Sequence, residues 1–138
     1  MVFCSPAFAQ DIQEIHKVAG SGDLPKIKSL LKANPELVKA VDHHSATPLH
    51  YAVNDYQKAV VEVLLANKAD INAQDDAGRT PLFRAVSREA ADMVEFLVAH
   101  KADVNIKSKA GTTPLKVALL TNQADVAKLL RKNGAKEE

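Results

Sequence analysis

The side chains that could do acid–base or metal chemistry are few and scattered in this chain of 138 residues. His43 and His44 are the only adjacent histidines. Neighbouring side chains of an extended segment point to opposite sides, which is poor geometry for chelating one metal ion. No cysteine or second histidine pair lies near them. We interpret both as exposed contact residues and predict no metal site.

His50 is the strongest candidate for a catalytic residue, because the hydroxyl group of Thr47 lies close in the sequence. The residues 33 and 66 positions later are Phe83 and Lys116, so equivalent positions accept other side chains. Catalysis needs two or three groups that converge on one point. The sequence has no HExxH, CxxC or GxSxG motif, and Gly20–Asp23 lacks the Gly-Lys-Ser/Thr of a phosphate-binding loop. We expect a protein that is not an enzyme and uses no cofactor.

A 33-residue period sets the positions of these residues. The tripeptide Thr-Pro-Leu begins at Thr47, Thr80 and Thr113. A fixed period of this length indicates stacked units of secondary structure, because one unit cannot bury its apolar face alone. Such a stack has an extended surface and no deep central pocket, so we expect binding rather than catalysis. Two further columns keep the spacing: Ala52, Ala85 and Ala118, and Leu64, Leu97 and Leu130.

Each repeat predicts two short helices followed by a loop. In the first full copy, Thr47 can cap a helix and Pro48 suits its first position, where a missing N–H costs nothing. This helix is expected to end at about Asn54. Apolar residues predict a second helix over about residues 58–67. The polar segment 70–79 then predicts an extended turn or hairpin.

The combined pattern resembles the ankyrin repeat over about residues 12–138. The signature is fullest at Thr47-Pro48-Leu49-His50-Tyr51-Ala52, and Asp70-Ile71-Asn72 returns as Asp103-Val104-Asn105. The resemblance implies an all-α repeat solenoid, in which each unit has two antiparallel helices and a β-hairpin loop. It also implies that His50 buttresses the turns by hydrogen bonding. About four repeats are expected, at residues 12–46, 47–79, 80–112 and 113–138.

Polar side chains stand at outer positions of the first and last repeats. Lys26 and Ser29 replace apolar residues of the later copies, and Arg131 does so in the last copy. Terminal repeats have one face in water, so we expect capped ends, a complete four-repeat solenoid and a monomer. Lys68 and Lys101 stand where the family has glycine with positive φ, a conformation that costs lysine about 1 kcal/mol.

Residues 1–9 are interpreted as a signal-peptide remnant or a disordered tail, and residues 10–138 as a single ankyrin-repeat domain. The first nine residues carry no charge and end in Ala7-Phe8-Ala9, the small-x-small pattern of a signal peptidase site. The pattern is incomplete, because no Lys or Arg precedes the apolar stretch. Cys4, the only cysteine, is an alternative lipid-attachment site, although Phe3 before it argues against this. The expected location is the periplasm or the exterior of a bacterium, with the cytoplasm as the alternative.

The composition narrows the kinds of partner. A net charge of +1 gives no reason to expect nucleic acid or an anionic membrane. No apolar run approaches the roughly 18 residues of a membrane-spanning helix. The hydrophobic content of 46% is too high for a disordered chain. A folded protein with a protein partner is the expectation that remains.

In the ankyrin family, partners dock on hairpin tips and on the surface of each first helix, which together line a concave face. Arginine is favoured in interfaces, and Arg79 and Arg88 could both meet one acidic group of the partner. We predict a non-catalytic protein–protein interaction module; an inhibitor or immunity-type protein that blocks one toxin or enzyme is the alternative. The predicted contact residues are His43, His44, Asn54, Asp55, Asp76, Arg79, Ser87, Arg88, Lys107, Lys109 and Thr121.

Overall fold

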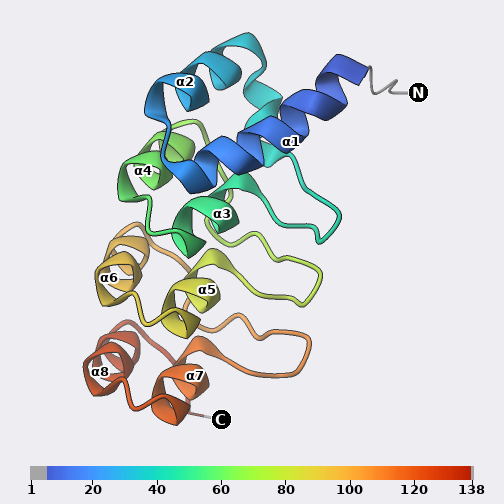
Figure 1. Cartoon of the computed structure of the whole chain (residues 1–138). Helices are drawn as coiled ribbons and strands as arrows, with labels where there is room; N and C mark the ends of the chain where they lie inside the picture. Colours follow the sequence, from blue (N-terminus) through green and yellow to red (C-terminus); the bar gives the residue numbers. More distant parts are fainter. Residues whose placement is uncertain (1–5, 138) are drawn as a thin grey trace. The chain divides into compact units, whose positions relative to one another are not determined.

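The computed structural model describes residues 6–137, which hold eight α-helices and one 3-10 helix and no strand. The described chain divides between Asp70 and Ile71 into two compact units. Figure 1 labels their helices. The first unit contains α1 (Pro6–Ser21), α2 (Leu24–Ala33), the 3-10 helix η1 (Pro35–Lys39), α3 (Pro48–Asn54) and α4 (Lys58–Ala66). The second contains α5 (Pro81–Ser87), α6 (Ala91–Ala99), α7 (Pro114–Leu120) and α8 (Ala124–Lys132).

Pairs of helices build both units. In the first unit, α1 packs against α2 and α3, and α3 packs against α4. In the second, α5 pairs with α6 and α7 with α8, while the first helices α5 and α7 also pack on each other. The alanines and leucines that recur every 33 residues are fully buried, so the period marks residues through which the helices pack. Buried members are Ala52 and Leu64 in the first unit, and Ala85, Leu97, Ala118 and Leu130 in the second.

The Thr-Pro-Leu motif starts three helices, as predicted. Proline stands at the first position of α3, α5 and α7, and the preceding threonine is the N-cap. Each threonine oxygen accepts a hydrogen bond from a backbone N–H of the first turn, which would otherwise lack a partner. The N–O distances are 3.4 Å from His50 to Thr47, 3.1 Å from Phe83 to Thr80 and 3.2 Å from Lys116 to Thr113.

A residue with positive φ follows the C-terminal end of each of the helices α3 to α7. Lys68 and Lys101 have φ of 68° and 67° after α4 and α6, as the family pattern predicted. The backbone N–H of Ala102 then donates to the carbonyl of Leu97 (3.0 Å), which closes the end of the helix. The first helices end in the same conformation, which the sequence did not predict because no glycine marks these positions. The residues are Tyr56, Glu89 and Asn122.

Replacing Lys101 by glycine is expected to raise the free energy of unfolding by about 0.5–1 kcal/mol, because the relief of left-handed strain exceeds the entropy that glycine adds to the unfolded chain. Urea denaturation measures the change. Lys128→Gly is the matched control: it lies within helix α8, where the same replacement should cost about 1 kcal/mol. A loss of stability in Lys101→Gly would contradict the prediction.

The loop tips are tight turns. The backbone N–H of Asp75 donates to the carbonyl of Arg79 (3.0 Å), and that of Gly78 donates back to Asp75 (2.9 Å). The expected β-hairpin is therefore reduced to a hydrogen-bonded turn, since no strand occurs in residues 6–137. Equivalent turns span residues 42–46 and 108–112.

Helix α1 extends further towards the N-terminus than the repeat predicts. It begins at Pro6, so residues 6–9 form its first turn and not the irregular tail that was one interpretation. Ala7 and Ala9 have high helix propensity, which favours this conformation. Residues 1–5, including Cys4, lie outside the described part of the chain. The signal-peptide interpretation stays a prediction.

The outer positions are exposed, as predicted for Lys26, Ser29 and Arg131. Lys26 on α2 also forms an ion pair with Glu14 on α1 (3.3 Å). Among the described helices, none has both the length and the apolar character that crossing a membrane requires.

Candidate protein-binding surface

The side chain of the first residue shapes each turn. Oδ1 of Asp75 accepts hydrogen bonds from the backbone N–H groups of Ala77 and Arg79 (3.0 and 2.9 Å). Together with the backbone bonds between Asp75, Gly78 and Arg79, they close the turn. The polar residues at 42, 75 and 108 follow the 33-residue period, a signal that the sequence interpretation missed. In the other turns, Oδ1 of Asp42 accepts from His44 and Ala46 (2.8 and 3.0 Å), and Oγ of Ser108 accepts from Thr112 (3.3 Å).

Asp75 also holds two arginines in the second unit. Its side chain is fully buried, and Oδ2 accepts from Nε of Arg79 (3.1 Å) and from Nη2 of Arg84 (2.7 Å). Burial alone would raise the pKa of Asp75. The hydrogen bonds from Arg79 and Arg84 and the charge of Arg79 outweigh burial, so the pKa lies below the usual value. The carboxylate is therefore ionised at neutral pH.

Asp42 occupies the equivalent position in the first unit with different partners. The hydroxyl group of Tyr51 donates to Oδ2, in place of an arginine. Burial raises the pKa of Asp42, but the hydrogen bonds from Tyr51 and from the backbone of Ala46 and His44 together hold it below the usual value. Both turns thus contain an ionised aspartate.

His16 of α1 ties that helix to the turn at residues 42–46. The side chain is 4% exposed, and its ring nitrogens lie 2.6 Å from the carbonyl oxygen of Ile12 and 2.8 Å from that of Ala46. Its ring also meets the ring of Tyr51 edge-on, with centroids 5.1 Å apart. This role could not be predicted from the sequence, because His16 and Ala46 lie thirty residues apart and belong to different elements.

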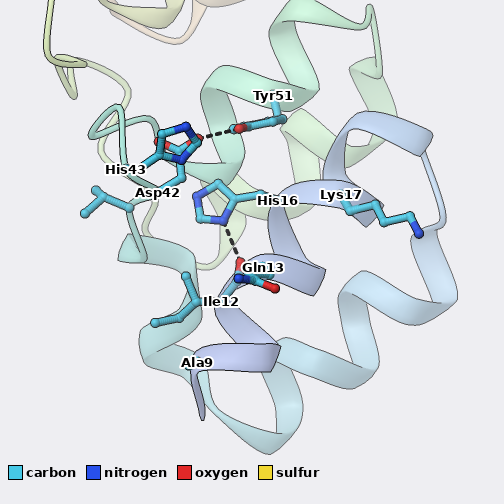
Figure 2. Close-up of a pocket in the computed structure, with 9 residues that line it drawn as sticks. Ala9, Ile12, Gln13, His16, Lys17, Asp42, His43 and Tyr51 are labelled. Carbon is cyan, nitrogen blue, oxygen red and sulfur yellow. Dashed lines mark hydrogen bonds between the residues drawn. The ribbon is translucent and has the colours of Figure 1, made fainter. Parts of the chain in front are cut away.

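A cavity of about 670 Å³ lies between α1, the turn at residues 42–46 and α3. Figure 2 shows Tyr51 directed at Asp42 on one side, Ala9 and Ile12 of α1 on the other, and Lys17 directed away from the histidines. At this cavity Tyr51 donates to Asp42, and both nitrogens of His16 contact carbonyl oxygens. The side chains of Gln13, Lys17 and His43 also line it.

His50 is a structural residue. The backbone N–H of Thr47 donates to Nδ1 of His50 (3.1 Å), and the side chain is 1% exposed. The two residues thus bind each other reciprocally and fix the start of α3. The structure confirms the hydrogen-bonding role that the resemblance implied.

The predicted contact residues fall at two places in each unit. In the first, His43 and His44 lie in the turn before α3, exposed and with ring centroids 4.0 Å apart, whereas Asn54 and Asp55 lie at the other end of that helix. In the second unit, Asp76, Arg79, Lys107 and Lys109 belong to the turns and the residues beside them, and Ser87, Arg88 and Thr121 belong to the ends of α5 and α7.

Arg79 and Arg88 lie at opposite ends of α5. Arg79 precedes the N-cap of α5 and is held by Asp75, while Arg88 is the C-cap of the same helix. The seven residues of α5 separate them, a helix length of about 10 Å. Arg84, which the sequence interpretation did not select, lies between the two and binds the same carboxylate as Arg79.

The turns of the second unit are joined to each other. The backbone N–H of Lys109 donates to the carbonyl of Ala77 (2.9 Å), and Nε2 of Gln74 donates to the carbonyl of Lys107 (3.4 Å). A Cβ atom on Gly78 would lie 2.8 Å from the backbone nitrogen of Lys109, so glycine permits this contact. These bonds hold the two neighbouring turns of the second unit in one register.

The lowered pKa values of Asp42 and Asp75 predict a loss of stability in acid. A carboxyl group with a folded-state pKa below the unfolded value of about 4 stabilises the fold above that pH, and the contribution disappears as pH falls through the folded pKa. We therefore expect the free energy of unfolding, measured in urea, to fall from pH 5 to pH 2. Asp75→Ala should show a shallower fall; an equally steep one would contradict this assignment.

The next findings concern metal binding and the family of the chain. Among residues 6–137, no group of three or more His, Cys, Asp or Glu side chains is placed to hold a metal ion. The family described as "Ankyrin repeats (3 copies)" matches residues 13–75 and 54–138, while a comparison with curated proteins gave no match. Ankyrin repeats generally serve as protein–protein interaction modules and are typically not catalytic. The stacked helix pairs, the threonine caps and the family match together show that this chain belongs to the ankyrin-repeat family of all-α repeat solenoids.

Proposed function

We propose that the chain binds a partner protein through its turns and the exposed ends of the first helix of each pair, and does not itself catalyse a reaction. One observation supports this assignment most directly. The backbone bond between Lys109 and Ala77 and the packing of α5 on α7 fix exposed side chains from two repeats in one register. A pre-organised surface loses little conformational entropy on binding, which favours affinity.

Site-specific photo-crosslinking in cells that make the protein tests this proposal. A crosslinking amino acid is placed at Ser87 or Thr121, both exposed at the ends of first helices. Glu95 and Lys128, exposed on the second helices α6 and α8, are the matched controls. Figure 1 shows the loops of this unit on the side of α5 and α7, away from α6 and α8.

A defined crosslinked protein from Ser87 and Thr121, and none from Glu95 and Lys128, is the expected result. Equal crosslinking from both sets would overturn the assignment of the surface. The absence of any specific product from all four positions would count against a protein-binding role.

We also propose that the chain is exported, on the strength of the Ala7-Phe8-Ala9 motif. Cleavage after Ala9 would leave α1 with twelve of its sixteen residues, including the buried Ile15, His16 and Ala19. Protein sequencing from the envelope or culture fraction should then begin at Gln10. Recovery of the intact N-terminus in the cytoplasm would refute export.

A further inference from the structure

The second unit has more basic than acidic side chains along its turns and α5. Residues 75–88 and 107–113 contain two acidic side chains, Asp75 and Asp76. Their basic side chains, called here the basic face, are Arg79, Arg84, Arg88, Lys107 and Lys109. The whole chain has a net charge of only +1, so this local excess is not a property of the composition.

Asp75 neutralises only part of this charge. One carboxylate is shared by the guanidinium groups of Arg79 and Arg84, which leaves the cluster of three residues positive by one unit. The Asp75 side chain has no exposed surface, whereas those of Arg79 and Arg84 are 39% and 22% exposed. The cations therefore reach the surface and the anion does not.

The ion pair with Asp75 holds the side chain of Arg84 in a position where it can also bind a carboxylate of a partner. Nη2 of Arg84 is bound to Asp75, which restricts the rotamers of a long side chain, so less entropy remains to be lost on binding. Nε of Arg84 is buried, so a second anion can reach only the exposed part of this guanidinium group.

The neighbouring cations extend this cluster along the unit. Arg88 lies four residues after Arg84, one turn further along the same side of α5. Lys109 lies in the adjoining turn, whose backbone is bonded to Ala77. One repeat before Arg84 and Arg88 stand Tyr51 and Asp55, so the first unit lacks this charge.

We propose that the basic face binds an acidic segment of the partner protein, in which Asp or Glu side chains pair with Arg84, Arg88 and Lys109. The proposal rests on the protein-binding function and adds the chemistry of the partner. Arginine donates to carboxylates through two parallel N–H groups, which gives direction as well as attraction. Charge of one sign on a fixed surface also speeds encounter with a partner of the opposite sign.

Selection from a phage library of random twelve-residue peptides tests the proposal on the whole chain. The same library is offered to Arg88→Glu/Lys109→Glu and to the control Lys128→Glu/Lys132→Glu, which alters α8. Each variant exchanges two cations for two anions, so the net charge of both falls from +1 to −3. Neither changes Arg79 or Arg84, which hold the buried Asp75, and thermal melting verifies that both variants fold.

Enrichment of Asp and Glu on the wild-type chain and on the α8 control is the expected result. Binding of the selected peptides to Arg88→Glu/Lys109→Glu should fall at least tenfold, because two attractive charge pairs are lost. Binding to the wild-type chain should weaken from 50 to 500 mM salt, because salt screens the attraction between the charges. Equal losses in both variants would refute the basic face as the site.

Three other outcomes would overturn this proposal, and the first of them separates it from the function on which it rests. Selection of neutral or basic peptides whose binding requires Arg88 and Lys109 would contradict an acidic partner segment. It would still support the proposed protein-binding surface. If no peptide is enriched, both proposals fail. A single-stranded oligonucleotide is tested as a second polyanion, and tighter binding of it than of the best peptide would refute a protein segment as the ligand.

Discussion

Replacing Leu97 by alanine is expected to lower the free energy of unfolding by about 2–5 kcal/mol. Leu97 lies on α6, is fully buried and belongs to the leucine column of the repeat. The substitution removes apolar contacts and leaves a cavity that rigid neighbouring helices fill only in part. A chain of this size is stabilised by roughly 7–20 kcal/mol in total, so the loss is a large share. Urea denaturation followed by circular dichroism measures it.

Leu120→Ala is the control for this change, since it removes the same atoms from a side chain that is 72% exposed on α7. Its effect should stay within about 0.5 kcal/mol. Similar losses from both substitutions would mean that the leucine column does not form the core.

Replacing Asp75 by alanine should cost about 3 kcal/mol, near the lower end of what breaking a buried ion pair costs, because Arg79 and Arg84 can still reach water. The change also removes the acceptor for two backbone N–H groups of the turn. Thermal and urea unfolding both report the loss, and the turn should become more open to proteolysis.

Two comparisons identify the cause of that loss. Asp42→Ala should cost less, because Asp42 is bonded to the neutral hydroxyl of Tyr51 and no arginine is left without its anion. Asp75→Ala combined with Arg84→Met should recover part of the stability, since the second change removes a cation from the cluster. No recovery in the double variant would show that the backbone bonds, and not the charges, carry the effect.

The sequence by itself determined the architecture of each repeat. Thr47, Thr80 and Thr113 cap helices because a hydroxyl group before proline acts on the turn next to it, which needs no distant contact. The boundaries of α3 and α4 were also correct to within a residue, because local helix propensity and the apolar pattern set them. Positive φ at Lys68 and Lys101 followed from the family pattern.

The surface was predicted less well. Tyr56, Glu89 and Asn122 also adopt positive φ, but without glycine nothing local marks them. The β-hairpin was expected from the family, and the structure has a turn capped by an aspartate or serine side chain instead.

Only the tertiary structure decided which charges act together. Arg79 and Arg88 were both predicted to contact one acidic group of the partner, whereas the structure shows that Asp75 of the same chain binds Arg79 and Arg84 and that Arg88 caps the end of the helix. The side chain of Asp75 meets those arginines because the turn folds back before α5. His16 likewise meets Ala46, thirty residues away, only because α1 packs on α3. Periodic sequence specifies local bonds between near neighbours, whereas the direction of a long charged side chain depends on what the fold brings beside it.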